Sequence, residues 1–278
     1  MVKPIDLLGL ITMSNKREKI LFSLKCGPMS LTQINEMLGV KSPESLPQLT
    51  RMVDSNLIYR DDNRVYHLTR KGHVLVNVYQ PLYDTIQVFE RFDGFFDTHD
   101  ISAIPDELFD RLQELKDCNL IESEEYNICE SHPEFLEGVI NSLCFKGVAC
   151  IFRSSWISLF LGLANHGVPI EIIITEGIYN KIKQEYPNEL EEGLKNKKAH
   201  IYICEDLKVS FSTTDQFFSL SLNFAVNGSH DTKSDIIGVD SAAIRWGKDL
   251  FKYYKEKAVE VPKTLPENIH QLTINNTT

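Results

Sequence analysis

The chain has 278 residues with a formal net charge of −10, and 42% of them are hydrophobic, which is typical of globular proteins and long enough for two domains. No apolar run reaches the roughly 18 residues of a membrane helix and no signal peptide is visible, so we expect a cytoplasmic protein without membrane contact. The six cysteines are scattered, which favours reduced thiols, with a thiol sensor built on Cys144 and Cys150 as the alternative.

Three short helices are predicted first. Residues 4–12 are apolar and could form a helix that packs on a partner subunit, and a second helix follows Ser14 and ends at Gly27-Pro28. A third helix begins after Ser30, a good N-cap, and ends at Gly39, where a left-handed residue is preferred. Apolar residues at helical spacing predict the inward faces of the second and third helices: Ile20, Leu21 and Leu24, then Leu31, Ile34 and Leu38.

A fourth helix is predicted to start near Ser42 or Ser45. Pro47 lacks an N–H and fits only the first turn of a helix, which favours the start at Ser45. The helical period then predicts that Leu46, Leu49 and Val53 face inward. Gln48, Arg51 and Ser55 are expected to face outward, with Ser45 at the tip.

A β-hairpin is predicted next, from residues 57–60 and 64–68 joined by turn formers at 61–63. Helix, turn, helix and hairpin predict a winged helix-turn-helix, whose last helix fits the major groove of double-stranded DNA. Residues 1–75 carry a formal +4 and residues 76–278 a formal −14, so basic charge gathers where phosphates would bind. A domain that docks protein is the alternative. The candidate DNA-binding residues are Lys41, Ser42, Ser45, Gln48, Arg51, Arg60 and Arg64.

The hairpin also carries a resemblance. Leu57-Ile58 followed by the stretch YHLTRKG at residues 66–72 resembles the "LI…Y.LT..G" wing signature of prokaryotic winged-helix repressors. This resemblance implies the fold and says little about the operator.

A long helix is predicted from Thr69 to about Arg91, and its apolar face continues past the winged module. Long helices at this position usually pair two protomers, and a two-fold operator requires a dimer, so we expect a homodimer. A linker helix packed on the second domain of its own chain is the alternative. The apolar residues are Val74, Leu75, Val78, Leu82, Ile86 and Phe89.

A second domain follows a hinge at residues 92–100. Its strands are predicted at residues 101–104, 120–121, 126–128, 147–153, 168–175, 199–204, 208–212 and 217–226. Its helices are predicted at residues 105–116, 133–143, 156–165, 178–195 with an interruption at Tyr186-Pro187, and 241–257. Alternating strands and helices indicate an α/β layer with a partly parallel sheet. The expected domains are residues 1–95, residues 96–258 and a disordered tail at 259–278.

Three segments of the second domain resemble the methanogenesis-regulatory family of archaeal transcription factors. They are HDISAIP at residues 99–105, VPIEIIITEGI at residues 168–178 and AAIRWGKDLFKYY at residues 242–254. The resemblance implies an archaeal regulator of α+β class, with a winged helix-turn-helix joined by a long helix to an α/β effector domain. It also implies that this effector domain is similar in fold to phospholipase D and to the sugar-sensing half of TrmB-type regulators.

The phospholipase D likeness raises the alternative of a phosphodiesterase-like enzyme with an accessory DNA-binding head. That chemistry needs His-x-Lys, and none of the eight histidines has a lysine two residues later; His230 comes nearest, with the wrong spacing. No serine elbow, P-loop, dinucleotide fingerprint or metal-ligand cluster is present either. We therefore expect no catalytic residues, no cofactor and no metal.

The remaining interpretation of the second domain is a sensor for a small-molecule effector or a signalling protein. Ligands of open α/β sheets bind beyond the carboxyl ends of the strands. At those ends Arg153 could hold an anion and Trp156 could stack on a ring, although each residue alone could be an ordinary loop or core residue. The candidate ligand-binding residues are Arg153, Ser154, Trp156, Thr175, Glu176 and Asp206.

Overall fold

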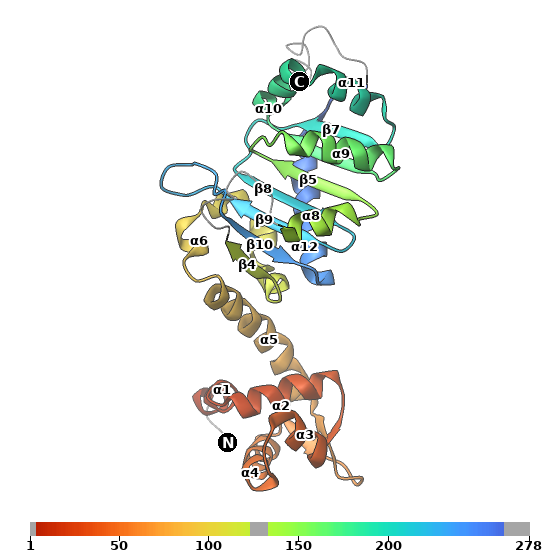
Figure 1. Ribbon diagram of the computed structural model, residues 1–278. Coiled ribbons are helices and arrows are strands. Elements are labelled where there is room, and N and C mark those ends of the chain that lie inside the picture. Colours follow the sequence, from red (N-terminus) through yellow and green to blue (C-terminus); the bar gives the residue numbers. More distant parts are fainter. Residues whose placement is uncertain (1–3, 123–132, 264–278) are drawn as a thin grey trace, which may run out of the picture. The chain divides into compact units, whose positions relative to one another are not determined.

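The computed structural model describes residues 4–122 and 133–263 of a chain that divides into two compact units, Met1–Asp84 and Thr85–Thr278 (Figure 1). The division falls inside the long helix α5 (Arg70–Arg91), whereas the sequence places the boundary after residue 95. None of the helices in the described ranges is long and apolar enough to cross a membrane.

The N-terminal unit combines four helices and the first part of α5 with a small antiparallel sheet. Its elements are α1 (Pro4–Thr12), α2 (Asn15–Cys26), β1 (Met29–Ser30), α3 (Leu31–Leu38), α4 (Ser42–Asp54), β2 (Ile58–Arg60) and β3 (Val65–Leu68). The predicted hairpin is present as β2–β3, and β1, which the sequence does not reveal, adds to its other edge in the order β1-β3-β2.

Local signals fix α3 as expected. The Ser30 side chain and the Gln33 side chain close a reciprocal capping box at its start. Gly39 ends it in the left-handed region with φ +64°. The side chains predicted to face inward from α2, together with Ile34 from α3, form the core of the unit.

The predictions for α4 need two corrections. The helix starts at Ser42, with Pro43 in its first turn and Pro47 inside the helix, so the start at Ser45 is wrong. The buried face consists of Ser45, Leu49 and Met52, at helical spacing i, i+4 and i+7. Leu46 and Val53 are each 40% exposed, which contradicts the predicted inward face. The apolar residues Leu46 and Val53 lose the inward position to Ser45 and Met52, because the Ser45 hydroxyl finds an acceptor in Asn35 of α3.

The C-terminal unit is built on one sheet, to which eight of the described strands contribute in the order β11-β7-β6-β5-β8-β9-β10-β4. The strands are β4 (Asn119–Glu122), β5 (Phe145–Ala149), β6 (Ile170–Ile174), β7 (Ala199–Ile203), β8 (Val209–Thr214), β9 (Phe218–Leu222), β10 (Ser234–Gly238) and β11 (Val259–Glu260). The pairs β5–β6 and β6–β7 are parallel and the other pairs antiparallel, so the predicted partly parallel sheet is confirmed.

Helices cover both faces of this sheet (Figure 1). One face carries α8 (Pro133–Ile140), α9 (Ser155–Asn165), α10 (Glu176–Glu185) and α11 (Pro187–Lys195), and the other carries α12 (Ser241–Glu256). Short elements precede β4: α6 (Phe95–Thr98), η1 (Ile101–Ala103), α7 (Asp106–Phe109) and η2 (Leu112–Leu115).

Several predictions for this unit are wrong. Residues 101–104 form a 3-10 turn instead of a strand, because the Asp100 carboxylate accepts from the Ser102 N–H at 3.1 Å. Residues 105–116 form two short helices instead of one, β5 ends at Ala149 instead of Arg153, and β10 was not predicted. Val259–Glu260 pair with β7 and Val261 is buried, so the predicted tail does not begin at residue 259. The predicted strand at 126–128 and the rest of the tail, from residue 264, lie outside the described residues.

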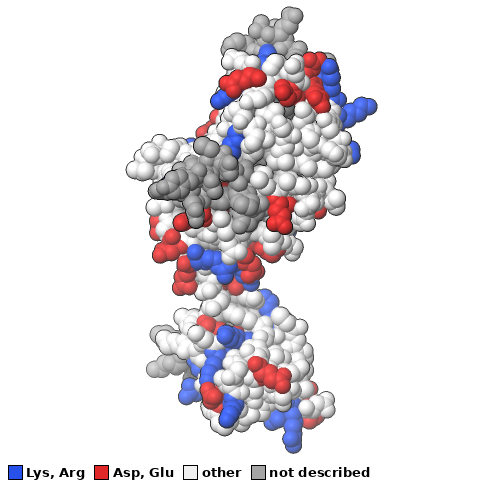
Figure 2. Space-filling view, viewed as in Figure 1, with Lys and Arg blue, Asp and Glu red and all other residues white. Residues whose placement is uncertain are grey.

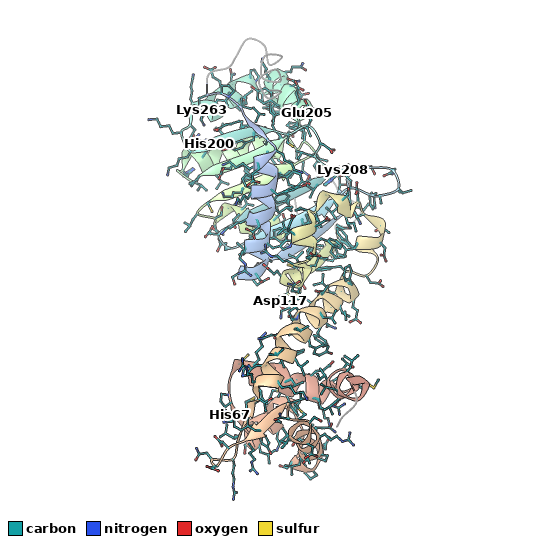
Figure 3. All side chains as sticks on the ribbon, turned by 180° about the vertical axis from the view of Figure 1, so that it is seen from behind. His67, Asp117, His200, Glu205, Lys208 and Lys263 are labelled. Carbon is teal, nitrogen blue, oxygen red and sulfur yellow. The ribbon has the colours of Figure 1, made fainter. Side chains whose placement is uncertain are left out.

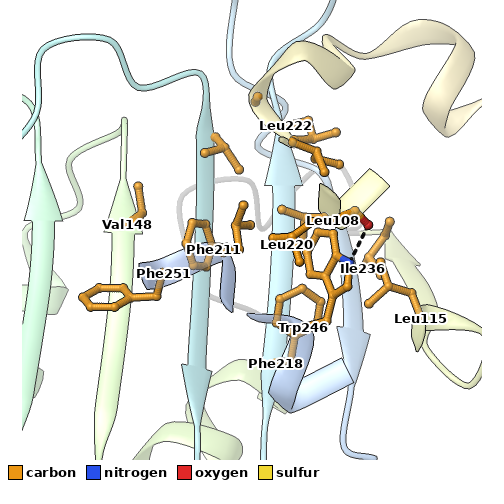
Figure 4. Packing of buried hydrophobic residues seen from close by; sticks show 14 of the residues in the cluster. Leu108, Leu115, Val148, Phe211, Phe218, Leu220, Leu222, Ile236, Trp246 and Phe251 are labelled. Carbon is orange, nitrogen blue, oxygen red and sulfur yellow. Dashed lines mark hydrogen bonds between the residues drawn. The ribbon is translucent and has the colours of Figure 1, made fainter. Parts of the chain in front are cut away.

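The Trp-Gly pair of α12 belongs to the core between that helix and the sheet (Figure 4). Trp246 is fully buried, its Nε1 donates to the Leu108 carbonyl at 2.9 Å, and its ring meets Phe218 edge to face at 5.6 Å. A Cβ atom on Gly247 would lie only 2.4 Å from the Phe218 ring, so only glycine allows this close approach. This conspicuous motif is therefore structural.

Candidate functional site

The exposed side of α4 carries two of the predicted DNA-binding side chains. Lys41 occupies the N-cap position of α4, Arg51 lies in its last turn, and both are exposed. Gln48 is half-buried, and its Oε1 accepts a hydrogen bond from Arg17 Nη1 at 2.7 Å. Lys41 and Arg51 are therefore exposed cations of this region, and Arg17 holds the Gln48 amide, which lies between them in the sequence.

The two serines of the predicted site instead join α4 to α3 through Asn35. Asn35 Nδ2 donates to Ser42 Oγ at 2.9 Å, and Ser45 Oγ donates to Asn35 Oδ1. Ser45 is fully buried, so it does not lie on the surface where the sequence analysis placed it. A buried hydroxyl needs a partner, and Asn35 supplies it.

The hairpin carries the remaining two candidates. Arg64 is exposed at the turn with φ +65°, and the Arg60 guanidinium lies 5.5 Å from the centre of the Tyr66 ring. Asp61 holds the turn, because its carboxylate accepts from the Val65 N–H at 2.8 Å and lies 3.0 Å from His67 Nε2 (Figure 3). Arg64 therefore lies in a turn that the Asp61 carboxylate holds together, and Arg60 ends the strand that enters this turn.

Arg17 is a functional candidate that the sequence analysis missed. It is only 7% exposed, and its Nε donates to the Leu10 carbonyl of α1 while Nη1 holds Gln48. Burial, followed by the charge of Arg51, lowers its pKa. Lys16 beside it contacts Glu44 of α4 at 2.8 Å. The charged run at residues 16–19, directly before the inward face of α2, is the sequence signal for this bracing role.

The charge distribution differs between the units. Figure 2 shows Lys and Arg side chains at several places on the N-terminal unit, and Asp and Glu at many places on the C-terminal unit. This agrees with the formal charges of the two parts of the sequence. Phosphate binding is therefore favoured at the N-terminal unit.

The C-terminal unit contains a cavity of about 170 Å³ between the sheet and the helices α9, α10 and α11. Most of its lining is aliphatic or aromatic, including Phe145, Trp156, Phe160, Ile172 and Ile178. Such a lining suits a small apolar group.

Hydroxyl groups from two strands form the opposite wall. Ser210 and Ser212 of β8 and Ser219 and Ser221 of β9 alternate with the apolar residues that face α12. Ser212 and Ser219 hydrogen-bond to each other at 2.8 Å, and Ser221 donates to the Asp231 carbonyl at 2.7 Å. The spacing S-x-S in both strands is the sequence signal for this wall, and the sequence analysis did not use it.

His230 lies at this cavity together with groups that do not themselves line it. Its Nδ1 is 2.9 Å from Asn223 Oδ1 and 3.2 Å from Cys150 Sγ. Burial lowers the pKa of His230 to about 4 and raises the pKa of the Cys150 thiol. Both groups are therefore uncharged near pH 7, so Cys150 is not a thiolate at that pH.

The neighbouring residue Asp231 ties the cavity wall to the segment after α5. Asp231 Oδ2 lies 3.1 Å from Nε2 of His99, whose ring stacks between those of Phe95 and Phe224. Burial would raise the pKa of Asp231, but hydrogen bonds from the Lys233 and Ser234 backbones and from His99 bring it below its usual value. The carboxylate is therefore ionised and held in place.

The predicted ligand-binding residues do not meet at one site. Arg153 and Trp156 line the cavity, with the guanidinium 5.6 Å from the Trp156 ring centre. Glu176 and Asp206 line a separate cleft of about 730 Å³, to which the charged residues Glu205 and Lys208 also belong (Figure 3). Thr175 caps α10 by accepting from the Ile178 N–H, and Ser154 is an exposed residue that lines neither space.

A metal-binding site would require several His, Cys, Asp or Glu side chains close together. Within residues 4–122 and 133–263, no three of the His, Cys, Asp and Glu side chains come close enough together to hold a metal ion. The polar groups at the cavity are instead bonded mainly to each other.

Comparisons with known proteins identify two matching domains. The family model described as "Methanogenesis regulatory protein FilR1, N-terminal domain" matches residues 5–87, and the one described as "Methanogenesis regulatory protein FilR1, middle domain" matches residues 128–257. The methanogenesis regulatory protein FilR1 of Methanothrix harundinacea (strain 6Ac) is 27% identical over 258 residues. That match covers 89% of this chain but 56% of the relative, so the chain spans little more than half of its length.

Two solved structures show weaker likeness. TrmBL2, an archaeal chromatin protein, aligns with a TM-score of 0.43 and 13% identity over 92% of this chain and 98% of its own. Quinone-bound YodB from B. subtilis aligns with a TM-score of 0.27 and 23% identity over 30% of this chain and 93% of its own. The sequence matches thus carry the assignment: because both domains of one regulatory family are matched in order along a single chain, the protein belongs to the family of the methanogenesis regulatory protein FilR1.

Proposed function

We propose that this protein is a cytoplasmic transcriptional regulator that binds double-stranded DNA through α4 and the β2–β3 hairpin, used as a winged helix-turn-helix. The observation that carries the proposal is the match of residues 5–87 to the N-terminal domain of a regulatory family. Those residues include the braced helix α4 and both arginines of the hairpin.

The arrangement divides the work between two kinds of contact. Lys41, Gln48 and Arg51 on α4 are the groups for base edges and adjacent phosphates, and Arg60 and Arg64 on the hairpin are phosphate ligands. Ser42 stays at the edge of this surface, while buried Ser45 positions the helix. Arg17 orients Gln48 from behind.

Fluorescence anisotropy with the promoter of its own gene tests DNA binding. Affinity should fall steeply as salt rises, and Arg51→Ala and Arg64→Ala should each weaken binding and reduce the salt slope by about one unit. Lys25→Ala is the matched control, because Lys25 is a cation of the same unit that hydrogen-bonds Gln80 of α5. Absence of binding at low and high salt would reject the proposal. If only Lys25→Ala lost binding, DNA would bind at a surface around Lys25 and not at α4 and the hairpin.

We infer further that the protein is a homodimer paired through α5. One stripe of this helix, formed by Val74, Val78, Leu82, Ile86 and Phe89, has side chains that are 42% to 71% exposed. Apolar residues at intervals of three and four are typical of helix pairing. Leu82→Asp should give monomers in light scattering and weaken DNA binding, while Asn77→Asp, at an exposed position off the stripe, should leave dimers.

The C-terminal unit is the sensor in this proposal and not an enzyme. Its cavity between the sheet and α9 is the effector site. The sequence resemblance implies a phospholipase D-like fold for this unit, and none of the histidines in the sequence has a lysine two residues later. Both family models that match the chain describe a regulatory protein. The effector would act by changing the affinity for DNA.

A further inference from the structure

The size of the cavity limits the ligand to about one ring. Its volume is about 170 Å³. A cavity of roughly 150 Å³ with an apolar lining can hold benzene. A molecule with one six-membered ring and one small substituent therefore fills it, and a larger ligand would require the helices α9 to α11 to move.

The charges around the cavity disfavour an anion. Among the described lining residues one is an arginine, Arg153, and three are carboxylates, Glu189, Asp231 and Asp235. The carboxylates do not make a cation site by their number, because Asp231 is already bonded to His99 and to the Lys233 and Ser234 N–H groups, and most of the remaining lining is hydrocarbon, in which a buried charge is costly. The cavity therefore suits an uncharged ligand.

The serine wall offers few unsatisfied donors. The Ser221 hydroxyl donates to the Asp231 carbonyl, and Ser210 Oγ accepts from the Cys150 N–H at 3.1 Å and lies 3.2 Å from Cys150 Sγ. Ser212 and Ser219 share one hydrogen bond, which uses one of their two O–H groups as donor. A ligand that only accepts hydrogen bonds can therefore use the remaining O–H of the Ser212–Ser219 pair and gains little else from this wall.

His230 is the exception, because the described residues form hydrogen bonds to only one of its two ring nitrogens. Nδ1 faces Asn223 Oδ1 at 2.9 Å, and an amide oxygen only accepts, so Nδ1 carries the proton. Nε2 then has a lone pair, and no hydrogen bond to it is formed by the residues that the structure describes. The low pKa of His230, about 4 because of burial, keeps this tautomer neutral near pH 7.

We propose that the cavity binds an uncharged molecule of one-ring size whose hydroxyl or N–H group donates a hydrogen bond to Nε2 of His230. The ring lies against Trp156, Phe160 and Ile172, and His230 selects donors over acceptors. This inference rests on the proposed effector role of the cavity and specifies its ligand class.

Three probes that share a ring but differ in polar group test the proposal by calorimetry on the full chain. Cyclohexanol can donate to His230, cyclohexanone can only accept, and cyclohexanecarboxylate is charged. One hydrogen bond corresponds to about a tenfold difference in affinity, so cyclohexanol should bind about tenfold tighter than cyclohexanone. The carboxylate should not bind.

Two variants locate the effect. His230→Leu should bind alcohol and ketone equally, and Ile172→Trp should bind neither, because the larger side chain fills the cavity. If either variant fails to fold, the affinities of the three probes for the native chain still show whether the cavity prefers an uncharged hydrogen-bond donor. Equal affinity for alcohol and ketone in the native chain, tightest binding of the carboxylate, or no binding of any probe up to its solubility limit would overturn the inference.

A parallel anisotropy titration separates this inference from the proposed function. Tight binding of cyclohexanol without any change in DNA affinity would leave the ligand class standing and reject the effector role. If the native chain binds DNA but binds cyclohexanol no tighter than cyclohexanone, the proposed ligand class is rejected and the proposed regulatory function remains valid.

Discussion

The two units use buried polar groups for different purposes. In the N-terminal unit, Asn35 and Arg17 lie behind α4, and their hydrogen bonds fix a helix whose functional side chains are exposed. In the C-terminal unit, His230 and Asp231 lie at the wall of a cavity, so the polar groups themselves are the candidate site. A surface that binds a polyanion needs rigid support from inside, whereas a pocket for a small molecule needs polar groups within an apolar lining.

The largest expected effect tests whether each unit depends on its own core. Trp246→Ala removes the fully buried indole that hydrogen-bonds Leu108 and packs on Phe218, so the C-terminal unit should lose about 3–5 kcal/mol of stability. Hydrogen exchange should rise across residues 133–260 and stay unchanged across residues 15–68. A matching rise in the N-terminal unit would show that the two cores are energetically coupled.

The second effect uses pH to separate the units. The pKa of His230 falls from 6.5 to about 4 on folding, chiefly through burial, so the unfolded chain binds the proton more tightly. The contribution of this pKa shift to the free energy of unfolding is complete above pH 6.5 and is lost as the pH falls toward 4. The loss corresponds to about 3 kcal/mol. Urea unfolding of the C-terminal unit between pH 7 and pH 4 should show this loss.

His230→Gln should remove most of that dependence. His166→Gln is the matched control, because it makes the same substitution at an exposed position at the end of α9. If the native chain and His230→Gln give parallel curves, the histidine does not titrate in this window.

A third, smaller effect concerns the support of α4. Asn35→Ala removes the acceptor on α3 and leaves the buried Ser45 hydroxyl with the Ser42 carbonyl at 3.3 Å, which should cost about 1.5 kcal/mol and weaken DNA binding. Thr32→Ala, at an exposed position of the same helix, should cost little. Thermal unfolding and anisotropy measure the two consequences, and full DNA affinity in Asn35→Ala would mean that α4 holds its position without this bridge.

Local signals made most of the N-terminal unit predictable. Caps such as Ser30, the left-handed Gly39 and the turn at residues 61–63 act within a few residues, and the structure contains the expected elements. The burial of Ser45 was not predictable in this way, because it depends on Asn35, ten residues earlier and on another helix.

The candidate site of the C-terminal unit depends on contacts between distant segments. Cys150 and His230 are 80 residues apart in the sequence, and the segment between them forms several strands and helices of the unit. Residues at strand ends were reasonable candidates, yet Arg153 and Glu176 turned out to line different spaces. The alternating serines of β8 and β9 indicated a polar face, but only the packing of α9 shows that this face borders a cavity.

The smallest effect separates stability from binding at one exposed residue. Arg64 adopts φ +65°, a conformation that glycine accepts without the strain of a Cβ atom. Arg64→Gly and Arg64→Ala both remove the charge and should weaken DNA binding equally, lowering the salt slope by about one unit. Arg64→Gly should nevertheless be more stable than Arg64→Ala, by up to about 1 kcal/mol in thermal unfolding. If the glycine variant binds DNA as well as the native chain, the contribution of Arg64 is to the turn and not to a phosphate; if the two variants are equally stable, the turn relaxes when the arginine is removed.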